Sequence, residues 1–266
     1  MKIGWIGLGM IGTAMVRRLL ATGFQVTVYE RGRGLEEVRA VGAGTCGDYQ
    51  SLAANSDLLT LCVFNDVQVR EVLFGSGALA AMRANSVLAI HTTGSPGLMR
   101  EIADAAPAGV SVLDATFSGG PHDAQAAALT LMVGGNPDGL ERAKGAFAAY
   151  ASRIDHLGPV GSGQVIKLLN NLLFATNLMN AAHVLELAEK QGFDGATIAG
   201  IIGTCSGASY AMARFQSSQP AGALLARVRP YLEKDVAAAM SSAKQSGLDV
   251  SAFDIVADYF RPSNKR

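Results

Sequence analysis

The stretch Met1-Lys2-Ile3-Gly4-Trp5-Ile6-Gly7-Leu8-Gly9-Met10-Ile11-Gly12 opens the chain and decides its fold. An apolar, strand-like run over residues 2–6 leads directly into glycines with the spacing G-x-G-x-x-G, and a helical pattern follows over residues 11–21. A glycine turn between a strand and a helix is typical of dinucleotide-binding folds. The pattern therefore predicts that this turn binds the pyrophosphate of a dinucleotide.

Each glycine has its own role in this prediction. Gly7 permits the tight turn, Gly9 lets the backbone approach the pyrophosphate, and Gly12 lets helix and strand pack closely. The first helical turn offers N–H groups and the positive end of the helix dipole to the phosphates. The predicted cofactor contacts of this turn are Gly7, Leu8, Gly9, Met10, Ile11 and Gly12.

The residues after the second predicted strand bear on the choice between NAD and NADP. Glu30 lies 18 residues after Gly12, close to the spacing of about 20 expected for an acid that binds the adenosine ribose. A carboxylate there suits the 2′-hydroxyl of NAD and repels the 2′-phosphate of NADP, so the pattern favours NAD. Arg31 and Arg33 keep NADP open, because an arginine can bind that phosphate; the alternative is that both are solvated loop charges.

Strand-like and helix-like runs alternate through the first part of the chain. The strand-like runs are residues 2–6, 25–29, 58–63, 87–91, 110–114, 129–133 and 153–157. The helix-like runs are residues 11–21, 66–73, 96–105 and 137–150. This alternation predicts β-α-β units and a mostly parallel sheet, which means an α/β Rossmann domain over residues 1–160.

The sequence pattern changes beyond Gln164. Residues 165–190 read as one long helix that is apolar on every face, and such a helix is expected to be buried. Further helical patterns cover residues 197–202, 222–232 and 236–245. We therefore expect an all-α second domain over residues 161–266, beginning with a long interdomain helix.

Composition excludes several classes of partner. The 22 basic and 22 acidic side chains cancel, which argues against a nucleic-acid partner. No uncharged apolar run of about 18 residues is present, so no membrane span is expected. The three cysteines show no metal-ligand spacing, so we expect no metal and a reducing, cytoplasmic setting without a signal peptide.

Three more motifs follow the glycine turn in order. They are Asp114-Ala115-Thr116-Phe117-Ser118-Gly119-Gly120, then Gly161-x-Gly163-x-x-x-Lys167-x-x-Asn170-Asn171, then Lys234-Asp235-Val236-x-x-Ala239. Together with the glycine turn they resemble the motifs of the β-hydroxyacid dehydrogenase family, the 3-hydroxyisobutyrate dehydrogenase-like proteins, over nearly the whole chain. The resemblance implies an oxidoreductase that transfers a hydride between NAD(P) and a small β-hydroxy acid or its semialdehyde.

Lys167 is the predicted general acid and base. A lysine on an apolar helix is costly to bury in its charged form, and burial favours the neutral amine that can accept a proton. The resemblance implies this catalytic role, with Asn171 as the partner four residues on, on the same helix face. Asn170, at the i+3 position, remains the alternative partner and a candidate substrate contact.

The substrate carboxylate is expected to bind in a cradle formed by Ser118, Gly119 and Gly120, whose short side chains let a small anion approach the backbone. His122 either contacts a polar substrate tail or is a surface histidine. Where the family motif has Pro-Val, this chain has Thr116-Phe117, which places an aromatic ring beside the loop. These departures widen the candidate substrates from 3-hydroxyisobutyrate to tartronate semialdehyde, 3-hydroxypropionate, threonate and close relatives.

Further cofactor contacts are expected at the carboxyl ends of neighbouring strands, where ligands gather in such sheets. Val63, Phe64 and Thr93 are candidates to line the cofactor groove, and the alternative for these loops is plain helix capping. The resemblance implies that Lys234 closes the pocket from the helical domain, and we place it among the cofactor contacts.

Other functions on the same scaffold remain open. An imine reductase usually carries another residue at the lysine position, and a phosphogluconate-type dehydrogenase would need an extended basic set that is not evident here. A non-catalytic NAD(P)-binding module is the third alternative, since fold does not fix function. The apolar surface of the helical domain leads us to expect a homodimer or tetramer.

Overall fold

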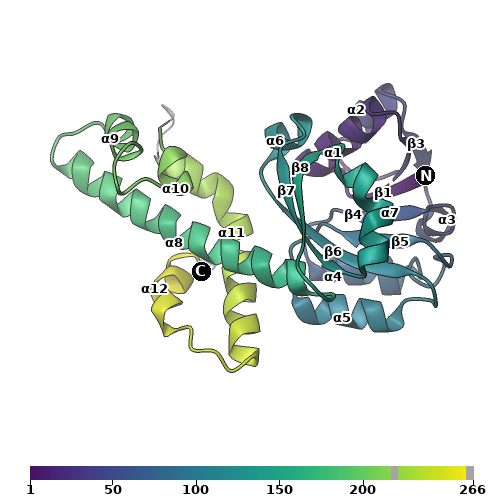
Figure 1. Ribbon diagram of the computed structural model, residues 1–266. Helices are drawn as coiled ribbons and strands as arrows, with labels where there is room; N and C mark the ends of the chain where they lie inside the picture. Colours follow the sequence, from purple (N-terminus) through teal and green to yellow (C-terminus); the bar gives the residue numbers. More distant parts are fainter. Residues whose placement is uncertain (217–220, 262–266) are drawn as a thin grey trace, which may run out of the picture. The chain divides into compact units, whose positions relative to one another are not determined.

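The computed structural model describes residues 1–216 and 221–261. The chain divides into two compact units, residues 1–167 and residues 168–266 (Figure 1). The predicted domain boundary, residue 160, falls in the turn before the long helix, whereas the division lies within that helix. Residues 217–220 and 262–266 of the predicted helical domain lie outside the described residues.

The N-terminal unit is built on an eight-stranded sheet with the order β3-β2-β1-β4-β5-β6-β7-β8. The strands are β1 (Lys2–Ile6), β2 (Gln25–Tyr29), β3 (Gly44–Cys46), β4 (Leu58–Leu61), β5 (Val87–Ile90), β6 (Ser111–Ser118), β7 (Leu129–Gly135) and β8 (Ala151–His156). Strands β1 to β6 run parallel, β7 is antiparallel to β6, and β8 is parallel to β7. The predicted mostly parallel sheet of a Rossmann domain is confirmed.

Helices cover both faces of this sheet. They are α1 (Met10–Ala21), α2 (Leu35–Ala40), α3 (Tyr49–Ala54), α4 (Asp66–Arg70), the π-helical turn η1 (Glu71–Gly75), α5 (Pro96–Ala105), α6 (Pro121–Gln125) and α7 (Pro137–Phe147). Helices α1, α2, α6 and α7 share one core with the sheet, and α3, α4 and α5 share the other. Strand alternation produces the two cores: in β1, Trp5 joins the first and Ile6 the second.

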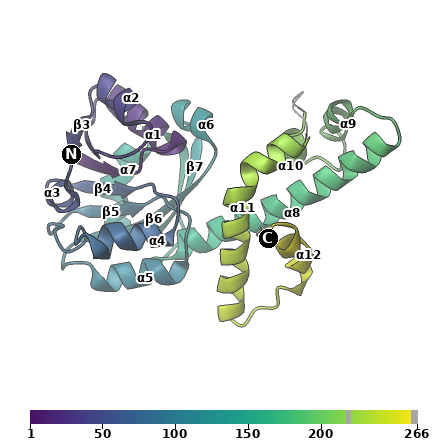
Figure 2. The ribbon, with the colours of Figure 1, turned by 180° about the vertical axis from the view of Figure 1, so that it is seen from behind.

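The helical unit continues α8 (Ser162–Lys190), which begins in the N-terminal unit. The other helices are α9 (Gly195–Ile202), α10 (Tyr210–Ala213), α11 (Ala221–Gln245), the 3-10 turn η2 (Ser251–Phe253) and α12 (Asp254–Tyr259) (Figure 2). Leu178 of α8 and Val236 of α11 lie in its own hydrophobic core. Within the described residues no helix is both long and apolar enough to span a membrane.

Two expectations for the helical unit are wrong in detail. The long helix is not buried on every face, because Leu169, Leu173 and Leu187 are 54%, 59% and 59% exposed. The two helices predicted over residues 222–232 and 236–245 are one helix, α11, which contains Pro230 in its interior. A proline there lacks an N–H donor, yet the surrounding helix continues through it.

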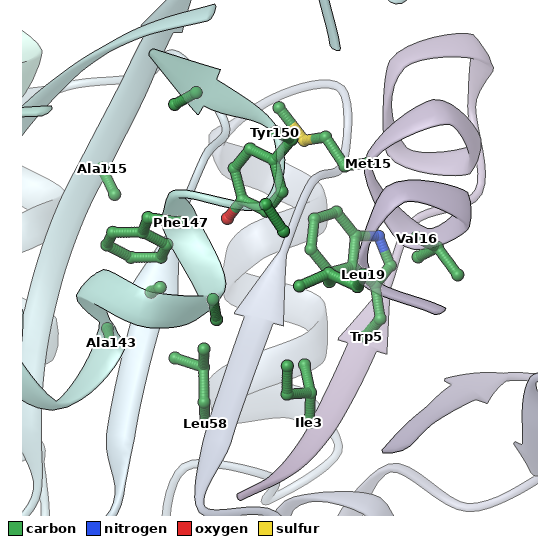
Figure 3. Close-up of a cluster of buried hydrophobic side chains, with 14 of the residues drawn as sticks. Ile3, Trp5, Met15, Val16, Leu19, Leu58, Ala115, Ala143, Phe147 and Tyr150 are labelled. Carbon is green, nitrogen blue, oxygen red and sulfur yellow. The ribbon is translucent and has the colours of Figure 1, made fainter. Parts of the chain in front are cut away.

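Large side chains fill the core between α1, α7 and the sheet. Figure 3 shows Trp5 of β1 beside Met15 and Leu19 of α1, with Tyr150 and Phe147 nearby. The rings of Trp5 and Tyr150 meet edge to face, with centroids 6.3 Å apart. Such aromatic pairs stabilise a core by roughly 0.5–1.5 kcal/mol beyond the area they bury.

His91 is a buried titratable group in this aromatic core. It follows β5, is 1% exposed, and its Nδ1 donates to the carbonyl oxygen of Ala115. Nε2 therefore accepts from the Tyr150 hydroxyl at 2.9 Å, which is the pattern of a neutral imidazole. Burial lowers the pKa of His91 from 6.5 to about 4 and raises the pKa of the Tyr150 hydroxyl.

This arrangement predicts a loss of stability in acid. Between pH 6.5 and about 4, His91 is protonated in the unfolded chain but stays neutral in the folded chain. The free energy of unfolding therefore decreases as the pH falls through this window. The free energy of unfolding of the wild type, minus that of His91→Gln, should decrease by about 3 kcal/mol across the window. Urea unfolding of both proteins at pH 7.5 and pH 4 measures this decrease. A stability difference between wild type and His91→Gln that does not change with pH would contradict the assignment of His91 as a buried neutral imidazole.

Candidate functional site

The glycine turn joins β1 to α1 in a conformation that only glycine adopts easily. Gly7 has φ +108°, and a Cβ atom there would lie 2.2 Å from the carbonyl oxygen of Cys62 in the neighbouring chain segment. A Cβ atom at Gly12 would lie 2.1 Å from the carbonyl oxygen of Gly7, so helix and turn pack in direct backbone contact. The geometry thus matches the roles predicted for these two glycines.

Gly9 differs from the other two glycines. A Cβ atom there would meet nothing within 4 Å, so open space faces the turn at this point. Gly9 caps α1 without any side-chain hydrogen bond, the first turn holds no acidic residue, and Met10 is 72% exposed. The N–H groups and the positive helix end suit a diphosphate here, so the residues present fit a dinucleotide.

The loop after β2 packs on the glycine turn. The backbone N–H of Gly34 donates to the carbonyl oxygen of Leu8 at 3.2 Å, and a Cβ atom at Gly32 would lie 2.8 Å from the Leu8 side chain. Glu30 and Arg31 are exposed at the start of this loop. The structure therefore brings the predicted ribose contact, Glu30, and its neighbouring arginine to the same sheet edge as the glycine turn.

The loops after β4 and β5 lie together at this edge. The N–H of Val63 donates to the Oγ1 of buried Thr92 at 3.0 Å, and Thr93 is the next residue. Phe64 is 43% exposed. Asn65 caps α4 and Ser95 caps α5, and the N–H of Phe64 donates to the Gln68 side chain in the first turn of α4, so helix capping involves this loop as well.

A buried carboxylate fixes the start of α8. Asp114 on β6 is fully buried and accepts hydrogen bonds from the backbone N–H groups of Gly161 (2.7 Å) and Gln164 (2.8 Å). Burial raises the pKa of Asp114, and these hydrogen bonds act against that rise. The first turn of α8 is thereby attached to the centre of the sheet.

Two more side chains strengthen this attachment. The Thr116 hydroxyl donates to the carbonyl oxygen of Gly163 at 3.0 Å. The amide of Gln164, fully buried, donates to the carbonyl oxygen of Thr92 and accepts from the N–H of Gly94, at 2.8 and 2.9 Å. The loop after β5 and the first turn of α8 therefore form one hydrogen-bonded unit.

Lys167 lies on α8 just beyond this attached turn and is partly buried. Its Nζ lies 5.9 Å from the centroid of the Phe117 ring, at the end of β6. Ser118 follows as the last residue of β6, so the predicted general base and the predicted substrate residue lie in the same region of the N-terminal unit.

The Ser118–Gly120 loop is closed by a side chain that the sequence prediction did not use in this way. The Asp123 carboxylate accepts from the N–H of Gly120 at 2.7 Å, so this donor of the predicted cradle is already engaged. Gly119 has φ +118°, and a Cβ atom there would lie 2.6 Å from the Leu129 side chain. His122, on the short helix α6, is exposed.

The helical unit holds the remaining predicted residues in a polar network. Asn170 donates to the side-chain oxygen of Asn171 at 3.0 Å, and Asn171 donates to the Asp235 carboxylate at 2.6 Å. The other carboxylate oxygen of Asp235 accepts from Lys234 at 2.6 Å. Asn171 and Asp235 are buried, so the orientation of the Asn171 amide is fixed by its two partners.

Sequence reasoning did not assign Asp114, Gln164 or Asp235 to the site. Asp114 carried a signal, since an acid at the end of an apolar strand must find buried donors. Asp235 lies in the quoted Lys234-Asp235-Val236 motif, but the sequence reveals the partners of neither Asp235 nor Gln164, because these partners lie far away along the chain.

Comparisons with known proteins agree with this geometry. Residues 2–158 match the family described as the NAD-binding domain of 6-phosphogluconate dehydrogenase. Residues 161–265 match the family described as NAD-binding of NADP-dependent 3-hydroxyisobutyrate dehydrogenase.

Individual proteins are similar over most of their length. An uncharacterized oxidoreductase of Shewanella frigidimarina is 30% identical, covering 97% of this chain and 91% of that protein. The 2-(hydroxymethyl)glutarate dehydrogenase of Eubacterium barkeri is 36% identical, over 79% of this chain and 71% of that protein. The solved structure of Mycobacterium tuberculosis 3-hydroxyisobutyrate dehydrogenase with L-serine is 26% identical, with a TM-score of 0.83 and coverage of 97% and 92%.

The resemblance drawn from the four motifs is confirmed by these matches. With a dinucleotide-binding turn on a Rossmann sheet and a helical second unit, the chain belongs to the 3-hydroxyisobutyrate dehydrogenase-like β-hydroxyacid dehydrogenases, a family of NAD(P)-dependent oxidoreductases.

Proposed function

We propose that this protein catalyses reversible hydride transfer between NAD(P) and a small β-hydroxy acid or its semialdehyde, with Lys167 as general acid and base. The observation that carries the proposal is the placement of Lys167 beside Phe117 and the Ser118 loop, on a helix turn attached to the sheet by Asp114. A general base must be held within reach of the hydroxyl whose proton it removes.

The chain's residues have defined tasks in this reaction. The nicotinamide cofactor, when bound, accepts or supplies the hydride. Lys167 takes the hydroxyl proton at its Nζ during oxidation and returns a proton to the carbonyl oxygen during reduction. Asn171, one turn further along α8, has an amide oriented by Asp235 and Asn170, and we assign it to the substrate oxygen.

Recognition of the substrate carboxylate falls to the loop that ends β6. We assign it to Ser118 and Gly119, because the Gly120 N–H already donates to Asp123. Gly120 keeps a structural role in this loop, and exposed His122 is the candidate contact for a polar substrate tail.

For the cofactor we propose NAD. Gly7, Gly9 and Gly12 would hold the pyrophosphate, and the Glu30 carboxylate would bind the adenosine ribose. Burial raises the pKa of the Tyr49 hydroxyl, and the Arg31 guanidinium acts against that rise. The carboxylate of Glu30 supports NAD over NADP, because it would repel the 2′-phosphate of NADP.

A substrate panel tests the reaction class. Absorbance of the reduced nicotinamide should change with NAD and a β-hydroxy acid such as 3-hydroxyisobutyrate, 3-hydroxypropionate, threonate or glycerate, and more slowly with NADP. Cofactor binding without turnover across the whole panel would instead favour a non-catalytic NAD(P)-binding module.

A lysine variant tests the mechanism. Lys167→Ala should lower kcat at least about 100-fold, since general acid–base catalysis contributes that much or more, while the Kd for NAD stays unchanged. Lys144→Ala, at an exposed lysine of α7, is the matched control and should keep wild-type rates. Steady-state kinetics and calorimetry give both values, and wild-type kcat in Lys167→Ala would rule out the assigned role.

We also propose that the protein self-associates through the exposed leucines of α8, Leu169, Leu173 and Leu187. Large exposed apolar side chains along one helix mark an interaction surface. Light scattering at micromolar concentration should show a dimer or tetramer, and Leu173→Glu should reduce the mass. A wild-type monomer under these conditions would remove the proposal.

A further inference from the structure

Phe117 occupies a position between two functional groups of the N-terminal unit. The Lys167 Nζ lies over its ring, 5.9 Å from the centroid. The same ring meets His91 edge to face, with centroids 6.1 Å apart at 78°. The predicted general base therefore lies over an aromatic ring that also packs against the buried aromatic core.

The ring is held in place by its strand and by its neighbours. Phe117 pairs with Leu131 in the antiparallel ladder between β6 and β7, near the end of β6. His91 is fixed by Ala115 and by Tyr150 at 2.9 Å, so the imidazole that supports the ring cannot turn freely. Phe117 is thus a rigid platform on the sheet, while a lysine side chain has several rotatable bonds.

We propose that Phe117 is a positioning residue for Lys167: the face of its ring attracts the ammonium group, keeps it at the end of β6, and sets the pH at which the lysine gives up its proton. A cation over an aromatic ring is stabilised by the ring quadrupole, and the neutral amine is not. This inference rests on the proposed function, because it concerns the group assigned as general base.

The buried titratable groups of the adjoining aromatic core, His91, Tyr150 and Cys62, stay neutral near pH 7. Burial lowers the pKa of His91 to about 4 and raises those of Tyr150 and, to about 12, Cys62. Burial raises the pKa of the Asp114 carboxyl, and the two backbone N–H groups that donate to it at the start of α8 act against that rise. His122, which we assign to a polar substrate tail, is also ionisable, so the NMR titration of Lys167 described below decides whether a changed pH profile after substitution of Phe117 belongs to that lysine.

The experiment compares Phe117→Leu, which removes the ring, with Phe117→Tyr, which keeps it. For oxidation, kcat/KM rises with pH as Lys167 loses its proton. Phe117→Leu should move the midpoint of this rise down by about 0.5–1 pH unit, the shift expected from losing a cation–π contact of ordinary strength. Phe117→Tyr should keep the wild-type midpoint.

Equal midpoints in all three proteins, with only a lower kcat in Phe117→Leu, would mean that the ring merely fills space, and this would overturn the proposal. Phe117→Met is the second non-aromatic variant, for the case that Phe117→Leu does not fold. A direct measurement independent of turnover is the NMR titration of the Lys167 side chain in ¹³C-lysine-labelled protein, with its signal identified by its absence in Lys167→Ala.

The two proposals fail in different ways. If Lys167→Ala keeps wild-type turnover, the assignment of the general base is wrong, whatever Phe117 does. If Lys167→Ala is inactive and the Lys167 titration midpoint is the same with leucine and tyrosine at position 117, the base assignment stands and only the role of Phe117 is wrong.

Discussion

The hydrogen bonds from the first turn of α8 to the Asp114 carboxylate are the interaction on which the rest of the site depends. A buried carboxylate is costly unless donors surround it, and here the backbone N–H groups of Gly161 and Gln164 supply them. If the start of the helix moved away from the sheet, the buried Asp114 carboxylate would lose its hydrogen-bond donors. Lys167 inherits its position from this constraint, because it lies one turn beyond the attached residues.

One edge of the sheet carries the residues that we assign to the cofactor and to the substrate. The glycine turn follows β1, the Val63 loop follows β4, the Thr92 loop follows β5, and Ser118 ends β6. These strands are parallel, so their carboxyl ends lie at one edge, and the strand order reverses between β1 and β4, where such sheets bind their ligands. The glycine turn and the first turn of α8, which precedes Lys167, are thus both attached to the same sheet.

Sequence periodicity predicted the elements that are long and regular. The bounds of β1, β2 and α5 agree with prediction, whereas β3 and α6 are too short for a pattern to register. An all-apolar helix does not reveal which face is covered, so the exposed leucines of α8 were not foreseen. The pairs Gly120 with Asp123 and Lys167 with Phe117 needed coordinates, because a sequence names donors and acceptors but not their partners.

Trp5 packs beneath the glycine turn, and its indole Nε1 donates to the carbonyl oxygen of Gly7 at 3.0 Å. It is the single tryptophan of the chain. The protein therefore contains one indole fluorophore, which is bonded to the backbone segment assigned to the pyrophosphate and shielded from solvent by the core. Because no second indole contributes, a change in tryptophan emission reports a change in the surroundings of this turn without any added label.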